Sequence, residues 1–263
     1  MKRSTGAKKK SFLKDHGGTI VILICVFTLY EVATDVTGTL DSMFFPGFSR
    51  ILPKMYESRT KLGESFISSM KLLIPGYFSA LFCGIVLGII IGTHPKVNKN
   101  LKPIIFALTP IPPSMLTPYL IAILPTFFLS SVAVIFIGCF WPVLSGTING
   151  IILIEQGYLD NANVVEFKGV KKMLYVILPA AAPHILSGAA TALNFSFILL
   201  VIAEMFATSS GMGYFVQYYA DFSDYARVIG GLLFTAVVVV VIKYGFECIK
   251  HKILFWSLNE HVE

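Results

Sequence analysis

Residues 66–92 read FISSMKLLIPGYFSALFCGIVLGIIIG, and Lys71 is the only charged side chain among them. An α-helix rises about 1.5 Å per residue, so about 20 apolar residues cross the hydrocarbon core of a bilayer. The stretch exceeds that length and carries almost no charge. It therefore predicts a helix that spans a membrane.

Five further apolar stretches accompany this one, at residues 19–34, 103–124, 126–148, 179–207 and 228–248. Of the 263 residues, 55% are hydrophobic and 14% are charged, whereas a soluble domain carries about 25% charged residues. The sequence therefore predicts an all-α membrane protein with about six spans. A basic segment before an apolar stretch is also typical of a signal peptide. Because no small-residue cleavage site follows the first stretch, we expect an uncleaved anchor.

Basic residues are concentrated on alternate connections between these stretches. The N-terminal tail holds six Lys or Arg, residues 93–102 and 149–178 hold three each, and three more lie from Lys243 onward, together 15 of the 21. Cytoplasmic connections are typically enriched in Lys and Arg, so we expect both termini in the cytoplasm. This gives a basic tail at 1–18, a transmembrane domain at 19–250 and a C-terminal tail at 251–263.

The sequence shows no pattern typical of catalysis or metal binding. The five histidines are dispersed, the four cysteines form no C-x-x-C pair, and no GxxxxGK[ST] phosphate loop occurs. We therefore expect no catalytic residue, no metal site, no cofactor in this chain and no enzymatic activity. No nucleic-acid module interrupts the apolar stretches, so nucleic acid is not an expected partner.

Prolines interrupt the third stretch. Residues 108–113 read LTPIPP, and Pro118 and Pro125 follow. Proline removes a backbone donor and kinks or breaks a helix, and a bilayer tolerates such a break where protein or a cavity satisfies the freed carbonyl groups. Two interpretations stay open, namely a kink that fits neighbouring helices and a broken helix that lines a passage.

The longest cytoplasmic connection has the pattern of a short amphipathic helix. Residues 154–179 read IEQGYLDNANVVEFKGVKKMLYVILP, in which Tyr158, Ala162, Val164 and Val165 recur at helical spacing. Five charged side chains between residues 160 and 172 prevent this segment from spanning the membrane. Its apolar side either packs on the bundle or in the headgroup layer, or it docks in a groove on a cytoplasmic protein.

Three polar side chains within the spans are candidates for the wall of a pathway, namely Tyr119, Asn194 and Glu204. Ionisable groups at membrane depth usually face a bundle interior or a cavity. Glu204 either gates the pathway or caps the following turn by accepting hydrogen bonds from backbone N–H groups around residues 209–211. Small polar residues such as those beside Asn194 also hold membrane helices together.

Several motifs occur in a recognisable order. LTPIPP at 108–113 precedes VILP at 176–179, and AEM follows at 203–205 before the small-residue turn SSGMGY at 209–214. This order, over roughly residues 45–255, resembles the membrane subunits of ATP-binding-cassette importers of the nitrate, sulfonate and taurine type. In that family a Glu-Ala-Ala segment and a glycine precede an Ile-x-Leu-Pro sequence that ends the cytoplasmic segment.

The chain departs from that family pattern in the Glu-Ala-Ala segment. Counted back from Pro179 without gaps, Asp160-Asn161-Ala162 stands at the Glu-Ala-Ala position and Glu166 stands at the glycine. Gly169 restores the glycine only if the segment is shortened by three residues.

The resemblance implies a type I importer fold in the bacterial inner membrane, with residues 154–172 as a helix that couples to a cytoplasmic ATPase. The implied partners are an ATP-binding subunit dimer that holds ATP and Mg²⁺, a second permease copy, an external substrate-binding protein and membrane lipid. The residues that this implies at the ATPase contact are Tyr158, Asp160, Asn161, Ala162, Val165, Glu166, Gly169, Lys171 and Lys172.

The resemblance implies a small organic anion or a vitamin-precursor-like solute as substrate. A different class, the self-sufficient secondary transporter, would be expected to show two related halves with helix breaks at corresponding positions. Only the third stretch is broken by several prolines. The sequence therefore favours the importer subunit over the secondary transporter.

Overall fold

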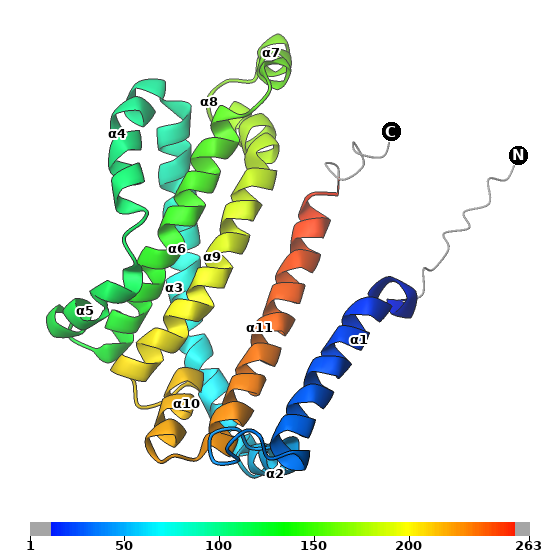
Figure 1. The fold of residues 1–263 in the computed structure, drawn as a ribbon. Helices are drawn as coiled ribbons and strands as arrows, with labels where there is room; N and C mark the ends of the chain where they lie inside the picture. Colours follow the sequence, from blue (N-terminus) through cyan, green and yellow to red (C-terminus); the bar gives the residue numbers. More distant parts are fainter. Residues whose placement is uncertain (1–11, 256–263) are drawn as a thin grey trace, which may run out of the picture.

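The computed structural model describes residues 12–255, and the regular elements in this range are all helices (Figure 1). Residues 1–11 and 256–263 of the two predicted tails lie outside the described part. The long helices are α1 (Phe12–Glu31), α3 (Arg59–Thr93), α6 (Phe127–Ile152), α9 (Leu178–Ala207) and α11 (Tyr225–Ile253). The shorter α-helices are α2 (Phe48–Glu57), α4 (Pro95–Leu108), α5 (Thr117–Ile123), α7 (Gln156–Val164), α8 (Gly169–Lys172) and α10 (Met212–Asp221).

Four of the helical runs in the described range are long and apolar enough to cross a membrane, and a bent pair raises the number to five. The four runs are Arg59–Thr93, Phe127–Ile152, Gly169–Phe206 and Tyr225–Ile253, and they match four of the predicted stretches. The prediction of an all-α membrane protein is confirmed. The first predicted stretch forms α1 and the short π-helix Val32–Val36, which are not among these runs. The total of six spans and the orientation stay predictions.

The proline-rich third stretch is not one straight helix. The run Pro95–Leu108 and the run Pro113–Ile123 meet at a bend of 75°. Pro112 and Pro113 lie directly at the bend, where their missing N–H groups cannot continue the helical ladder. The interruption that the prolines predict is therefore present as a bend that separates α4 from α5, and its place beside a passage stays a prediction.

The core of the molecule is the packing of α6 against α9 on one side and α3 on the other. Its side chains are mostly aliphatic, and the Tyr77 hydroxyl of α3 donates a hydrogen bond to the Ala189 carbonyl of α9 at 2.9 Å. Small residues let the helices approach closely, as is typical inside membranes. At Gly188 of α9, a Cβ would lie 2.7 Å from the Pro142 carbonyl oxygen of α6.

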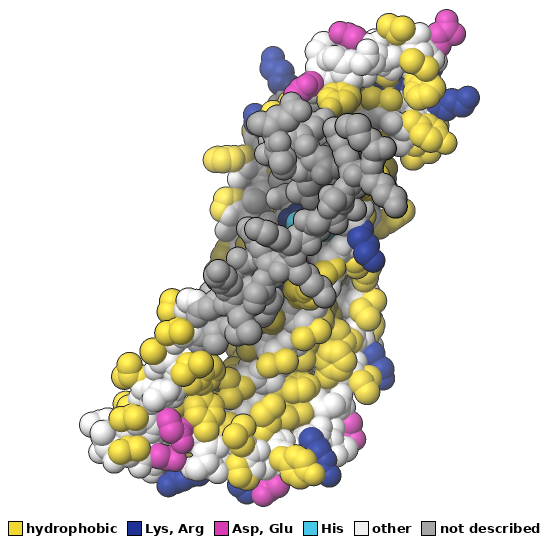
Figure 2. Space-filling view, turned by 90° about the vertical axis from the view of Figure 1, so that its right-hand side faces the viewer, with side chains coloured by type: hydrophobic (Ala, Val, Ile, Leu, Met, Phe, Trp, Pro, Cys, Tyr) yellow, Lys and Arg dark blue, Asp and Glu magenta, His cyan; other side chains and the backbone are white. Residues whose placement is uncertain are grey.

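The outer helices are attached mainly at one end of this core. α11 contacts α2 and α10 there, and α1 reaches the same end through the loop before α2 (Figure 1). We call this the α10 end, and we call the opposite end, which carries α7 and the junction between α3 and α4, the α7 end. On the face shown in Figure 2, the acidic side chains lie toward the two ends, and the described surface between them is mostly hydrophobic with a few Lys or Arg along one edge. This distribution fits a bundle that is wrapped by lipid.

The close approach at Gly188 gives a matched pair of substitutions. Gly188→Ala should lower the free energy of unfolding by about 2 kcal/mol, because the added methyl group meets rigid backbone. Gly63→Ala in α3 adds a methyl group where nothing lies within 4 Å, and it should raise stability by about 0.5 kcal/mol through helix propensity. Thermal unfolding in detergent measures both changes, and equal effects at the two positions would contradict the packing.

Candidate functional site

The predicted amphipathic helix is shorter than residues 154–172. α7 covers Gln156–Val164, and after a break α8 and the π-helix Met173–Ile177 lead without interruption into α9. The hypothesis of one helix through residue 172 is therefore wrong. Among the predicted contact residues, Glu166, Gly169, Lys171 and Lys172 lie beyond the end of α7.

A left-handed residue at Glu166 ends α7. Glu166 has φ of +57°, the Phe167 N–H donates to the Ala162 carbonyl at 2.9 Å, and the Glu166 N–H donates to the Asn163 carbonyl at 3.0 Å. This pair of bonds is the Schellman arrangement, in which glycine is the usual left-handed residue. The gap-free count places Glu166 at the family glycine, and the helix end lies at that residue. Gly169 is also left-handed, with φ of +54°.

A cleft of about 450 Å³ lies between α7 and the end of the bundle. From α7 and its end, Tyr158, Asn161, Ala162 and Val165 line it, and Tyr175 and Pro179 line it from the segment that leads into α9. Ala162 is buried, whereas 62% of Val165 is exposed. The apolar side of α7 therefore packs on the bundle at Ala162, and Val165 on the same side stays open to solvent or a partner.

The outward side of α7 is polar. The Gln156 amide donates to the Asp160 carboxylate at 3.1 Å, and the Lys172 ammonium donates to the Asn163 amide oxygen at 2.9 Å. The second bond joins α8 to α7 across the break. α7 stands out beyond the ends of α6 and α9 in Figure 1, so this side and the open cleft are both available to a partner.

Glu204 lies at the α10 end of α9, and its side chain is fully buried. Its carboxylate accepts a hydrogen bond from the Ser69 hydroxyl of α3 at 2.6 Å and another from the Gly213 N–H of α10 at 2.7 Å. The Ser69 oxygen in turn accepts from the Met212 N–H at 2.9 Å. Glu204 thus caps the first turn of α10 and joins three helices. The sequence indicated such a cap near residues 209–211, and the bonds lie two residues further on.

Asn194 belongs to a polar strip along α9. His184, Ser187, Thr191 and Asn194 are exposed and follow one another at spacings of three or four residues, which places them on one face of the helix. The opposite face carries Ala189 and Ala192, which are buried in the core. Tyr119 is exposed on α5, but no hydrogen bond or ring contact joins it to Asn194 within residues 12–255. The structure therefore groups Asn194 with other polar residues and leaves Tyr119 apart.

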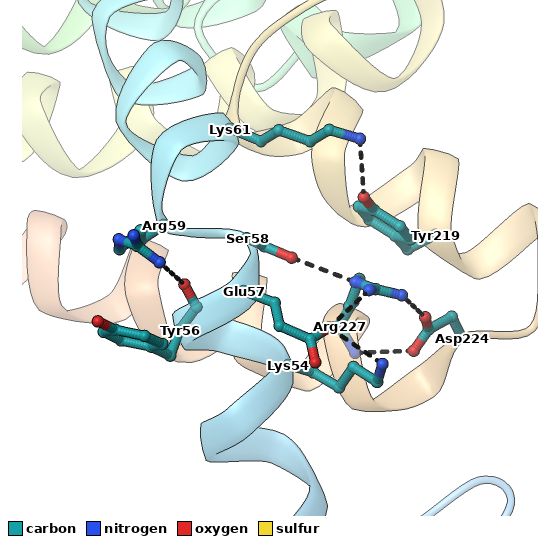
Figure 3. Close-up of polar contacts among 9 residues, drawn as sticks. All are labelled: Lys54, Tyr56, Glu57, Ser58, Arg59, Lys61, Tyr219, Asp224 and Arg227. Carbon is teal, nitrogen blue, oxygen red and sulfur yellow. Dashed lines mark hydrogen bonds and ion pairs between the residues drawn. The ribbon is translucent and has the colours of Figure 1, made fainter.

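A polar network at the α10 end was not predicted from the sequence (Figure 3). Arg227 of α11 pairs with Asp224, donates to the Ser58 hydroxyl at 3.2 Å and lies 3.1 Å from the Glu57 carboxylate. Its guanidinium also lies over the Tyr219 ring. Asp224 lies three residues before Arg227, a local spacing typical of a helix N-cap. Glu57 is 170 residues from Arg227 in the chain, so no local pattern indicates this ion pair.

The chain has clear similarity to known transport proteins. Residues 84–252 match the model of a family described as the binding-protein-dependent transport system inner membrane component. MJ0413 of Methanocaldococcus jannaschii, whose name describes it as an ABC transporter permease protein, is 30% identical over 73% of this chain and 73% of its own length. The taurine transport system permease protein TauC of Escherichia coli is 26% identical over 91% and 88% of the two chains. The nitrate import permease protein NrtB of Leptolyngbya laminosa is 30% identical over 65% and 61%.

The left-handed backbone at Glu166 gives a test of where α7 ends. Glu166→Gly should stabilise this end by about 1 kcal/mol, because a side chain in the left-handed region carries a steric cost that glycine lacks. Hydrogen exchange of the α7 amides should then slow by about fivefold. Glu166→Ala is the control, because it removes the carboxylate but keeps a Cβ and therefore the steric cost of the left-handed backbone. Its hydrogen exchange should stay close to that of the unsubstituted protein. Faster exchange in the glycine variant would contradict this helix end.

Proposed function

Because this chain belongs to the family of inner membrane components of binding-protein-dependent transport systems, we propose that it forms the solute pathway of an ATP-driven importer and couples to the ATPase at α7. The family is a component of transport systems and not a family of enzymes. ATP and Mg²⁺ are then bound by the ATP-binding subunits, and this chain converts their closure into movement of its helices.

The observation that carries this proposal is the position of α7. The helix stands beyond the end of the bundle, and it leaves Tyr158, Val165 and the exposed Tyr175 around an open cleft. A short helix with such a surface suits docking in a groove on a partner protein. Of the residues that the resemblance implies at the contact, Tyr158, Asp160, Asn161 and Val165 are exposed at α7 or its end and belong to this proposal.

The polar strip on α9 supports the pathway. Uncharged polar side chains that faced lipid would lose hydrogen bonds to water without replacing them, so His184, Ser187, Thr191 and Asn194 are better placed on a wetted surface. One copy of the chain presents this strip on an open face. We propose that a second permease copy closes the pathway opposite it, with Asn194 on the wall, Tyr119 near the helix break and Glu204 as part of the gate at the α10 end.

The relatives and the strip support a proposal for the substrate class. TauC is named for taurine and NrtB for nitrate, and both solutes carry an anionic group. The strip has donors from Ser187 and Asn194 and contains no carboxylate, whereas the Thr191 hydroxyl donates to the Ser187 carbonyl at 3.1 Å. We propose a small organic anion as the substrate, delivered by an external binding protein.

Co-purification with the ATP-binding subunit from its gene neighbourhood tests the coupling surface. Tyr158→Asp should reduce the ATPase retained by the tagged permease by about tenfold, because it places an unpaired charge in an apolar contact. Tyr56→Asp is the matched control, since Tyr56 is also an exposed tyrosine but lies on α2 at the α10 end. It should retain the ATPase fully.

Two outcomes would contradict this function. One is retention of the ATPase by the Tyr158 variant at the level of the Tyr56 variant. The other is solute uptake by the permease in vesicles that lack any ATPase, which is the behaviour of a secondary transporter.

A further inference from the structure

A second hollow, of about 270 Å³, lies between α4 and α6 toward the α7 end. Asn98, Lys102 and Phe106 line it from α4 and Thr109 from the residue after its end, while Ser145 and Asn149 line it from α6, with isoleucines from both helices. The backbone of α4 contacts mainly α3. The hollow is thus an open seam between α6 and one half of the broken helix pair.

The cations beside this seam have no paired counter-charge among residues 12–255. Lys96, Lys99 and Lys102 are exposed on α4, and none of them makes an ion pair or hydrogen bond with another residue of the described range. α4, α6 and residues 65–93 of α3 contain no Asp or Glu. The side-chain amides of Asn98 and Asn149 also have no hydrogen-bond partner among the described residues. The seam therefore offers a positive charge and free donors to an anion from outside the chain.

An apolar surface continues from the cations along α4. Ile104, Phe106 and Leu108 are exposed, and 81% of the Phe106 side chain is open. A free inorganic anion would gain nothing from this surface, because it has no apolar part. An amphiphile with an anionic head and acyl chains would contact both the lysines and the apolar surface. Basic pockets between membrane helices near one leaflet are a known type of phospholipid headgroup site.

We propose that this seam binds an anionic phospholipid. Its phosphate lies at Lys102 with the amides of Asn98 and Asn149, and its acyl chains lie along the exposed side of α4. The lipid fills the space between α4 and α6 and so holds the first half of the broken pair against the bundle. The site depends on the membrane setting of the chain and not on coupling to an ATPase.

Lipid binding by the purified full chain tests this site. Phosphatidylglycerol and phosphatidylcholine are titrated separately onto the delipidated protein in detergent, and bound lipid is counted by native mass spectrometry. The unsubstituted protein should bind phosphatidylglycerol more tightly. Lys102→Gln should weaken that binding by about fivefold through loss of one charge near the membrane surface, whereas Lys102→Arg should keep it.

The control is Lys243→Gln on α11, where the lysine is also exposed and carries no ion pair within the described chain. It should leave phosphatidylglycerol binding unchanged, and phosphatidylcholine binding should be the same in every variant if all are folded. Equal binding of the two lipids by the unsubstituted protein, or equal losses in the two Gln variants, would overturn the proposal. So would displacement of phosphatidylglycerol by inorganic phosphate, which would assign the seam to a free anion. No ATPase is present, so failure here leaves the proposed transport function untouched.

Discussion

Close contact between α3, α6 and α9 is the constraint on which the rest of the structure depends. In a bilayer the hydrophobic effect does not drive helices together, so association relies on tight packing and interhelical hydrogen bonds. Gly188 permits the approach of α9 to α6, and the bond from Tyr77 to the Ala189 carbonyl joins α9 to α3. The outer helix α11 packs against this core through side chains from Phe234 to Phe246, but no side-chain hydrogen bond joins that stretch to the core helices among the described residues. Its polar contacts lie at the α10 end, where Arg227 joins α11 to the junction of α2 and α3.

α9 connects the two ends of this core. Its helical run begins at Gly169, directly after α7, and extends to the buried Glu204, which accepts hydrogen bonds from α3 and α10. The polar strip with Asn194 lies between these points. The bond from Lys172 to Asn163 ties this run to α7 across the break, so under the proposed function a displacement of α7 by a partner would be carried along α9 to the strip and to Glu204. In the proposed function, this arrangement would let a contact outside the membrane act on a pathway within it.

Hydropathy was enough to predict the long apolar helices that the structure contains from residue 59 onward. A helix in contact with lipid must be apolar along its length, so its composition alone indicates it. The proline run likewise predicted the break before α5. The end of α7 was not predicted, since Glu166 adopts a backbone conformation for which glycine is the usual signal. A cap formed by Glu204 was one of the two alternatives that the sequence left open. The Ser69 hydroxyl that donates to Glu204 is 135 residues away in the chain and was not predicted. Contacts of that separation depend on the tertiary fold, and no local pattern encodes them.

If closure of the ATP-binding subunits drives transport as proposed, ATP should move the α7 helices of two permease copies toward each other. Val164 is 82% exposed on α7 and does not line the cleft, so Val164→Cys can carry a spin label without disturbing the packing. The four native cysteines are replaced first, and the label-to-label distance is measured by pulsed electron paramagnetic resonance in the complex with its ATPase. The distance should be shorter when ATP is trapped than when nucleotide is absent. An unchanged or longer distance would contradict the proposed coupling.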